Sequence, residues 1–291
     1  MSKFQTNFLL PLTFVLLYGN GFVATKYGLE NISPMAFLLV RFFIAFILLL
    51  CISYYLKVSW PKNIKEYIHI IIAGVLTVAV FSIGVYVSID LGVSPSLNAL
   101  IIALQPTFVS ILAMKLLSER ISKRHWFGLV IGFMGVTLVV MSKFDYSYNY
   151  GIIMSIFALA GLSFGNLYQK KYCSNMNLFS GGAIQTLASA LLVLPLMFVY
   201  EDVRFNFNID LVYAILYMSV AVSIGALSLL YIMIEKGEIS KVSSMFYLIP
   251  VCAVVMSYLF FDEDIDLRVL AGIVAVLMGM ALMNKKGKSR E

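Results

Sequence analysis

One arginine lies inside a long apolar stretch of the sequence, where a charged side chain needs a specific reason. Arg41 follows Pro34 by seven positions, in an otherwise apolar run from residue 34 to 56. At about 1.5 Å per helical residue it would lie roughly a third of the way into a membrane-spanning helix, where an unpaired cation is costly. Arg41 could anchor the carboxylate or another anion of a solute. It could equally be a structural arginine that bonds helix carbonyls or extends to the membrane surface.

Uncharged amide side chains occupy other apolar runs. Gln185 stands 144 positions after Arg41, and the remaining amides are Asn20, Asn98, Gln105 and Asn166. Asn98 and Gln105 are seven residues apart and therefore share one face of a helix. Because lipid offers no hydrogen-bond partners, such amides must either join neighbouring helices or line a wet cavity. Together with Arg41 we expect the set to outline a substrate-binding cavity.

Tyrosines and prolines in the apolar runs suggest two further roles. Tyr86, Tyr231 and Tyr247 could stack on a planar solute, or they could be packing residues. Pro106 and Pro250 stand 144 positions apart, each inside a predicted helix. A proline there removes a backbone hydrogen bond and bends the helix. We interpret this pair as kinks that shape a gate, a role that is compatible with simple packing.

The sequence lacks the motifs of common catalytic and metal sites. It has no GxxxxGK phosphate loop and no HExxH zinc motif. Its two histidines, His69 and His125, lie near the ends of apolar runs, and its three cysteines have no paired spacing. We therefore expect a protein that is not an enzyme, that binds no metal or cofactor and that cannot use ATP on its own.

The composition indicates a protein that lives in a lipid bilayer. The chain has 291 residues, of which 61% are hydrophobic and 12% charged. A helix that crosses the hydrocarbon needs about 20 apolar residues, and the apolar runs do not show the alternation of barrel strands. We predict an all-α integral membrane protein with ten transmembrane helices. Their approximate ranges are 8–25, 34–56, 68–89, 96–117, 125–141, 151–169, 178–200, 211–234, 242–261 and 269–284.

The two halves of the chain repeat each other at an offset of 144 residues. This offset aligns Pro106 with Pro250, Glu119 with Glu263, and all ten runs as five upon five. Because five is odd, the second unit must enter the membrane from the opposite side, which predicts inverted-topology repeats around a central cavity. We expect units at 8–141 and 151–284, followed by a basic cytoplasmic tail at 285–291.

The basic residues predict the orientation. With the N-terminus in the cytoplasm, the inside segments hold sixteen Lys and Arg residues and the outside segments hold four. This asymmetry places both termini in the cytoplasm. It also explains a difference between the repeats: the turn around Glu119 is basic and faces inward, whereas the turn around Glu263 is acidic and faces outward.

Glycines recur on the last helix of each unit. Gly128, Gly132 and Gly135 share one face, and Gly272 and Gly279 form the matching pair. Small residues let helices approach closely. We expect this face to pack within the monomer or, alternatively, to form a dimer seam.

Several segments resemble a known family. They are YGNGFVATKYGLE with SPMAFLLVRF, LQPTFVSILAMKLLSERIS with WFGLVIGFMGVTLVV, and the second copy ISKVSSMFYLIPVCAVVMSYLFFDE with AGIVAVLMGMALM. They are similar to the two EamA units of the drug/metabolite transporter superfamily. The resemblance implies a basket of ten helices, lined mainly by the first four helices of each unit. Tyr18 departs from the family, in which the first helix commonly carries Trp before Gly.

These observations predict a secondary transporter that works by alternating access in the plasma or inner membrane. One cation with amides and tyrosines suits a small polar metabolite, and we favour export of an amino acid or a related metabolite, the direction resting on the resemblance alone. The alternatives are uptake of a planar vitamin or nucleobase, and a channel. The expected partners are the solute and the lipid bilayer, without nucleic acid, and the expected state is a monomer, with a homodimer as the alternative.

Overall fold

The computed structural model describes residues 9–119, 121–142, 149–236, 242, 244–261 and 266–284. Within these ranges the chain is helical and has no β-strand; its one β-type contact is an isolated bridge between Ile32 and Phe205. Every apolar run predicted from the sequence coincides with helix. The 285–291 tail and the acidic turn around Glu263 lie outside the described residues.

The helices follow the chain in two similar series. The first comprises α1 (Leu10–Leu29), α2 (Pro34–Tyr55), α3 (Ile64–Gly74), the π-helical segment η2 (Val75–Val80), α4 (Phe81–Asp90), α5 (Pro95–Ile102), α6 (Gln105–Leu116) and α7 (Lys123–Ser142). The second comprises α8 (Asn149–Tyr172), α9 (Leu178–Tyr200), α10 (Ile209–Leu216), the π-helical segment η4 (Tyr217–Ala226), α11 (Leu227–Lys236), the 3₁₀ segment η5 (Ser244–Leu248), α13 (Ile249–Phe261) and α14 (Leu267–Asn284).

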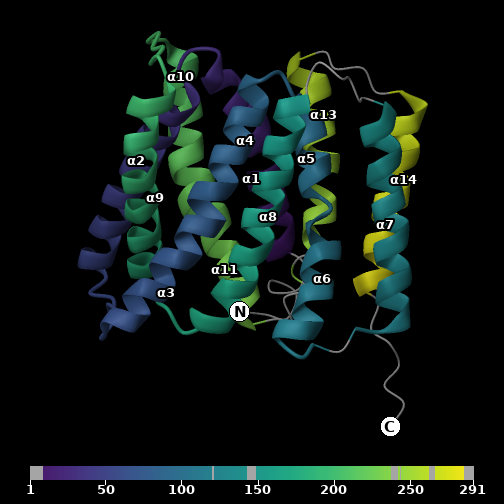
Figure 1. Ribbon diagram of the computed structural model, residues 1–291, viewed down its shortest axis with the longest axis horizontal. Helices are drawn as coiled ribbons and strands as arrows, with labels where there is room; N and C mark the ends of the chain where they lie inside the picture. The colour runs from purple at the N-terminus through teal and green to yellow at the C-terminus, as the bar shows by residue number, and fades with distance from the viewer. Residues whose placement is uncertain are drawn as a thin grey trace.

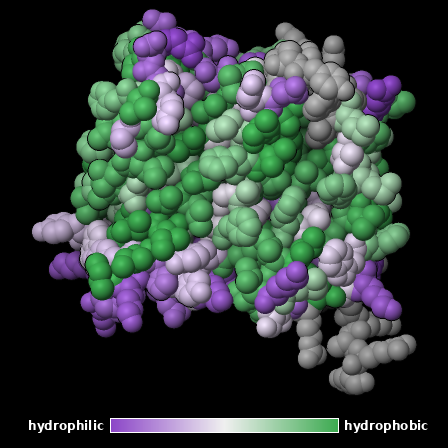
Figure 2. Space-filling view, viewed as in Figure 1, coloured by the Kyte–Doolittle hydropathy of each residue, from purple (hydrophilic) through white to green (hydrophobic). Residues whose placement is uncertain are grey.

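The helices are long and apolar, as a membrane protein requires. Among the described residues, six continuous helical stretches have the length and composition to cross a bilayer, and two shorter apolar helices accompany them. The six are Pro34–Tyr55, Ile64–Asp90, Pro95–Leu116, Asn149–Tyr172, Leu178–Tyr200 and Ile209–Lys236. Figure 2 shows a broad hydrophobic band across the visible face, with hydrophilic residues gathered toward the two ends of the bundle.

Polar caps mark where several helices begin. The side chains of Asn63, Ser94, Asn177 and Asn208 accept hydrogen bonds from backbone N–H groups in the first turns of α3, α5, α9 and α10. These N–H groups have no partner within the helix, so a side-chain oxygen at this position stabilises the helix start. Asn63 and Asn208 cap equivalent helices in the two series.

Two kinds of irregularity interrupt the long helices. The stretch from 95 to 116 breaks at Ala103 and Leu104, and Pro106 lies in the first turn of α6 beyond the break. Pro250 likewise lies in the first turn of α13, after η5. Each predicted kink is thus a change of helical segment with the proline just inside the new helix, where its missing N–H costs nothing. The π-helical segments η2 and η4 form the second kind, which occurs often at functional sites.

The helices stand side by side in one bundle, with α7 and α14 together at one edge (Figure 1). The large core cluster lies among α1, α2, α4, α9 and η4, and a smaller one lies between α5, α7 and α14. The glycine face packs within the chain. A Cβ on Gly128 would lie 2.5 Å from the carbonyl oxygen of Gly279, and one on Gly135 would lie 2.7 Å from that of Gly272.

Candidate functional site

Arg41 is buried inside the bundle and is held by hydroxyl groups. Its side chain on α2 is 4% exposed. Its Nε–H donates to Ser223 Oγ at 2.9 Å, and Nη1 donates to the Tyr86 hydroxyl at 3.1 Å. No carboxylate among the described residues pairs with it. The guanidinium therefore neither reaches the bundle surface nor has its charge neutralised by a nearby acid.

A small cavity of about 20 Å³ adjoins the guanidinium, which is room for about one water molecule. Its walls come from α1, α2, η4 and the η2–α4 helix, which also packs against α8. The polar lining residues, besides Arg41 and Tyr86, are Tyr18, Thr25 and Ser82. The volume is far below the range of about 300–1,000 Å³ that is usual for ligand pockets. A solute can therefore enter only when the lining helices move apart.

A second polar cluster surrounds Gln185 on α9. The Tyr231 hydroxyl donates to Gln185 Oε1 at 2.8 Å, and Gln185 Nε2 donates to Gln169 Oε1 at 2.9 Å. The hydroxyls of Tyr231 and Thr77 lie 3.3 Å apart. The members of this cluster lie on α8, α9, α11 and η2, and all of them are buried.

The two clusters are built alike. Arg41 and Gln185 are equivalent at an offset of 144, and Tyr86 and Tyr231 at an offset of 145. The shift by one is already present at the caps Asn63 and Asn208, which are 145 positions apart, so the additional residue of the second half precedes the third helical stretch. In both halves, a polar side chain of the second helix thus bonds to a tyrosine hydroxyl on the third.

Each cluster also takes a hydroxyl from the π-helical segment of the other half. Ser223 of η4 bonds to Arg41, whereas Thr77 of η2 lies beside Tyr231. Ser223 also lines a very small cavity of about 10 Å³ that Gln185 and Tyr231 share. The clusters are therefore neighbours across the boundary between the two halves.

Sequence reasoning missed Ser223, Thr77, Gln169 and the lining position of Tyr18. Serine and threonine are frequent in apolar helices, so their identity alone carries no signal. Gln169 lies near the end of a predicted run, next to two lysines. The positions of Ser223 and Thr77 in π-helical segments are the distinguishing feature, and sequence patterns do not reveal it.

The other predicted residues do not line the Arg41 cavity. Asn20 lies beside Tyr217 in a separate groove of about 570 Å³ between α1, α10 and α13. The Tyr247 hydroxyl lies 3.2 Å from that of Thr107, in the cluster near α7.

The three remaining amides are buried and incompletely bonded. Asn98 Oδ1, Asn166 Oδ1 and both amide atoms of Gln105 have no hydrogen-bond partner among the described residues. Their contribution to a substrate cavity stays a prediction, as does a gating role for Pro106 and Pro250.

One end of the bundle is closed by backbone hydrogen bonds between the two halves. At the α1–α2 end, Ile32 forms the isolated bridge with Phe205, and Ser33 N–H donates to the Arg204 carbonyl at 3.1 Å. Asn206 N–H donates to the Asn31 carbonyl at 2.7 Å. These bonds join the α1–α2 connection to the segment between α9 and α10.

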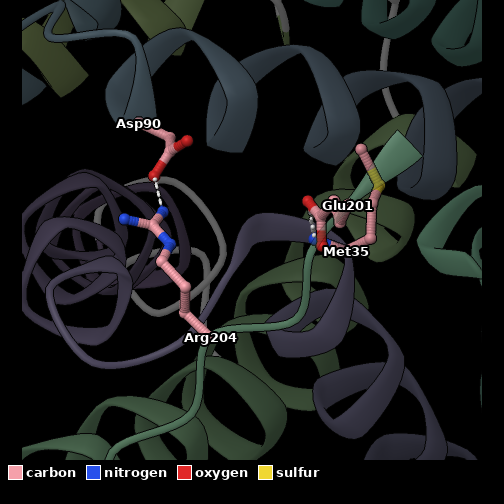
Figure 3. Close-up of polar contacts among 4 residues, drawn as sticks. All are labelled: Met35, Asp90, Glu201 and Arg204. Atoms are coloured by element: carbon pink, nitrogen blue, oxygen red, sulfur yellow. Dashed lines mark hydrogen bonds and ion pairs between the residues drawn. The ribbon is translucent and has the colours of Figure 1, made fainter.

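Charged side chains reinforce this end (Figure 3). Arg204 Nη2 lies 2.7 Å from Asp90 Oδ1, which links the α9–α10 segment to the end of α4. The Glu201 carboxylate accepts a hydrogen bond from Met35 N–H at 2.9 Å, in the first turn of α2. A carboxylate at a helix start is favoured by the helix dipole.

The opposite end has a wide cavity between the equivalent segments. At the α2–α3 end, the Ser180 hydroxyl donates to the Ser59 carbonyl at 2.7 Å. A cavity of about 510 Å³ lies beside this contact, and Trp60 and Lys171 are among its lining residues. Cys173 also lines it, and burial raises the pKa of its thiol to about 11. Within the described residues no group of His, Cys, Asp or Glu has a metal-binding arrangement.

Comparison with known proteins identifies the family. The model of the EamA-like transporter family matches residues 6–141 and again residues 149–285. The chain therefore belongs to the EamA-like transporter family. The two matches together cover nearly the whole chain. The EamA-like chain is thus a transporter and not an enzyme, and its apolar helices agree with a multi-pass membrane protein.

Relatives that match most of this chain occur in archaea and bacteria. An uncharacterized transporter of Archaeoglobus fulgidus is 29% identical over 95% of this chain and 98% of its own. The uncharacterized transporter YvbV of Bacillus subtilis is 25% identical over 100% and 95%. The uncharacterized inner membrane transporter YedA of Escherichia coli is 24% identical over 85% and 82%.

A solved crystal structure has the same fold as this EamA-like chain. It superposes with a TM-score of 0.77 at 15% identity, and the match covers 97% of this chain and 98% of the other. At this identity the likeness concerns the fold alone.

Proposed function

We propose that this transporter is a secondary carrier that binds the carboxylate of an amino acid or a related small metabolite at Arg41 and exports it by alternating access. The observation that carries the proposal is the buried, unneutralised guanidinium beside a cavity that both halves line. A buried cation without an acid partner is costly, and an anionic solute would offset that cost. A single cation suits a carboxylate better than a phosphate, for which several cations are expected.

We propose further that the two halves are inverted five-helix repeats in a ten-helix membrane bundle. The offset of 144 and the similar clusters around Arg41 and Gln185 support this arrangement. Several of the main helix contacts are also paired: α2 with its equivalent α9, α7 with its equivalent α14, and α1–α13 with α6–α8. Such a pattern is expected of a pseudo-twofold axis in the membrane plane.

The unequal ends of the bundle support alternating access. The bonds between residues 31–33 and 204–206 close the α1–α2 end, whereas the equivalent segments at the other end border a large cavity. Inverted repeats can exchange such arrangements, so that the second state would open the α1–α2 end. We place the protein in the plasma or inner membrane with both termini in the cytoplasm. In this orientation the closed α1–α2 end faces the outside.

Orientation can be tested independently of transport. We expect a cysteine introduced at Phe207, in the α9–α10 segment, to react with a membrane-impermeant thiol reagent added outside intact cells. A cysteine introduced at Lys62 is the matched position at the other end and should react only after the membrane is opened. The reverse labelling pattern would contradict the proposed topology.

The function is tested first by ligand binding. Purified protein is heated with a metabolite library, because a ligand that binds only the folded state raises the unfolding temperature. We expect carboxylate metabolites, amino acids among them, to stabilise the protein. Hits confined to nucleobases or flavins would contradict the amino-acid class and favour the planar solute, which the tyrosines and Phe81 could stack against.

Transport is then measured with the ligand identified in this way. In proteoliposomes we expect saturable counterflow, which Arg41→Gln abolishes while the protein still folds. Lys115→Gln is the matched control, since it removes a cation from the end of α6 rather than from the cavity. Ohmic, non-saturating flux would indicate a channel, and unchanged counterflow in Arg41→Gln would remove Arg41 from the site.

A further inference from the structure

Tyr18 brings an unpaired hydroxyl to the Arg41 cavity. Its side chain on α1 is 4% exposed and lines this cavity, yet its hydroxyl oxygen has no hydrogen-bond partner among the described residues. A buried hydroxyl without a partner destabilises the folded protein, because it loses its hydrogen bonds to water and gains none. Buried polar groups are nearly always bonded, so this exception needs an explanation.

The ring of Tyr18 is held firmly by aromatic neighbours. It stacks on Phe81 with a centroid distance of 5.9 Å and an interplanar angle of 28°. Phe246 contacts it edge-on at 5.6 Å, and Phe14 lies at 5.1 Å. Because these contacts restrict the ring, the hydroxyl cannot easily turn to another partner. Its position is set by packing.

Arg41 also has hydrogen-bonding capacity left for a ligand. A guanidinium has five N–H donors and no acceptor. The hydrogen bonds to Ser223 and Tyr86 use two of them, and the described residues provide no partner for Nη2. The cavity thus combines unused donors of a cation with the hydroxyl of a second residue. Both are suited to an anion with two acceptor oxygens.

The rest of the lining restricts the remainder of the ligand. Among the described residues that line the cavity, none is acidic, so an ammonium group would have no ionic partner there. Phe22, Met218 and Val222 provide apolar walls. An uncharged, small or apolar body is chemically compatible with these walls once they move apart to admit it.

We propose that Tyr18 and Arg41 together bind one carboxylate, and that the site selects for this carboxylate without requiring an ammonium group. In this arrangement the Tyr18 hydroxyl and Arg41 Nη2 each donate to the carboxylate oxygens. The inference rests on the proposed function, because it assumes that the Arg41 cavity is the substrate site. It narrows the substrate class to small monocarboxylates, of which amino acids are one kind.

The test uses two sets of compounds that vary the two charges separately. One set is L-alanine, propanoate, L-alaninamide and propanamide; the other is L-leucine, 4-methylpentanoate, L-leucinamide and 4-methylpentanamide. In at least one of the two sets, we expect both the amino acid and the plain carboxylate to raise the unfolding temperature of the wild-type protein. Neither amide of that set should raise it. Inorganic phosphate should have no effect.

Tyr18→Phe then separates a ligand-binding hydroxyl from a structural one. Since the hydroxyl has no partner, its removal should leave the unfolding temperature without ligand unchanged or slightly raised, while carboxylate affinity falls about tenfold or more. The control is Tyr217→Phe, which removes a hydroxyl bonded to the Leu17 carbonyl at 3.0 Å. That variant should lose stability and keep its carboxylate affinity.

The outcomes distinguish this inference from the proposed function. If carboxylates bind and Arg41→Gln abolishes binding, but Tyr18→Phe binds equally well, the role of Tyr18 is overturned and the function stands. If only compounds with an ammonium group bind, or if phosphate binds as well as the carboxylates, the substrate class is wrong. If no carboxylate of either set stabilises the wild type, the inference is overturned; saturable counterflow of another solute would still support a carrier.

Discussion

The guanidinium of Arg41 donates a 2.9 Å hydrogen bond to the hydroxyl of Ser223, which follows it by 182 positions and belongs to the other half of the chain. Ser223 in turn donates to the carbonyl of Met218 at 2.9 Å, within the π-helical segment η4. The buried charge is therefore attached to an irregular helical segment of the opposite half. A movement of one half against the other would change the surroundings of this charge directly.

Replacing Ser223 should destabilise the protein. In Ser223→Ala the Nε–H of Arg41 loses its acceptor inside the bundle, which we expect to cost about 1–3 kcal/mol of unfolding free energy. Thermal unfolding in detergent measures the loss. Ser257→Ala is the control, because the Ser257 hydroxyl is equally buried but has no partner among the described residues. Equal losses in the two variants would show that the bond to Arg41 contributes nothing.

A disulfide across the closed end should arrest transport. Bridged residues of antiparallel segments have Cα atoms about 4.5–5.5 Å apart, which is within the range of a disulfide. We expect Ile32→Cys with Phe205→Cys, in a background without Cys51, Cys173 and Cys252, to block counterflow when oxidised and to restore it when reduced. Each single cysteine variant should respond to neither treatment. Full counterflow in the oxidised double variant would show that transport does not require this end to open.

Weakening the ion pair at the same end should favour its opening. The Arg204 and Asp90 side chains are 63% and 30% exposed, so the pair adds less than about 1 kcal/mol to stability. Such an energy still shifts a balanced equilibrium several-fold. In Asp90→Asn, a cysteine introduced at Ser82 should react faster with a thiol reagent supplied from outside. Asp210→Asn, which removes another acid near this end, should leave the rate unchanged, and equal rates in both variants would contradict the prediction.

The close contact between α7 and α14 should not tolerate a side chain at Gly128. Its Cβ would lie 2.5 Å from the Gly279 carbonyl oxygen, so Gly128→Ala must push the two backbones apart. Overpacking of this kind costs about 1–3 kcal/mol. Gly225→Ala is a fair comparison, since its Cβ would lie 3.3 Å from the end of the Leu17 side chain and 3.7 Å from the Val220 carbonyl oxygen. The unfolding temperature of Gly128→Ala should be lower than that of Gly225→Ala. Similar unfolding temperatures would argue against tight packing of α7 on α14.

The reactivity of Cys173 should depend steeply on pH. Burial raises the pKa of this thiol to about 11, and only the thiolate reacts with alkylating agents. With Cys51 and Cys173 compared as single-cysteine variants, we expect the rate at Cys173 to rise about tenfold per pH unit between pH 7 and 9.5. After unfolding in denaturant the rate should level off above about pH 9. A plateau in the folded protein near pH 9 would indicate an ordinary thiol pKa.

The sequence was sufficient to predict the helices and to single out Arg41 and Gln185. Runs of about 20 apolar residues allow little besides helix in a bilayer, and each predicted run is helical in the structure. The repeat offset alone paired Arg41 with Gln185. It did not pair Tyr86 with Tyr231, because the second half has one additional residue before the third helical stretch, as the caps Asn63 and Asn208 show.

The sequence by itself determined membrane residence, the positions of the helices and the presence of one cation inside an apolar run, because these follow from local composition and from the absence of water in lipid. Only the tertiary structure decided which polar groups meet. It placed Ser223 and Tyr86 at Arg41, turned Asn20 toward a different groove and left the hydroxyl of Tyr18 unpaired in the cavity. These relations depend on helix rotation and on the π-helical segments, and a rotation of one residue, about 100°, moves a side chain to another face without changing the apolar pattern.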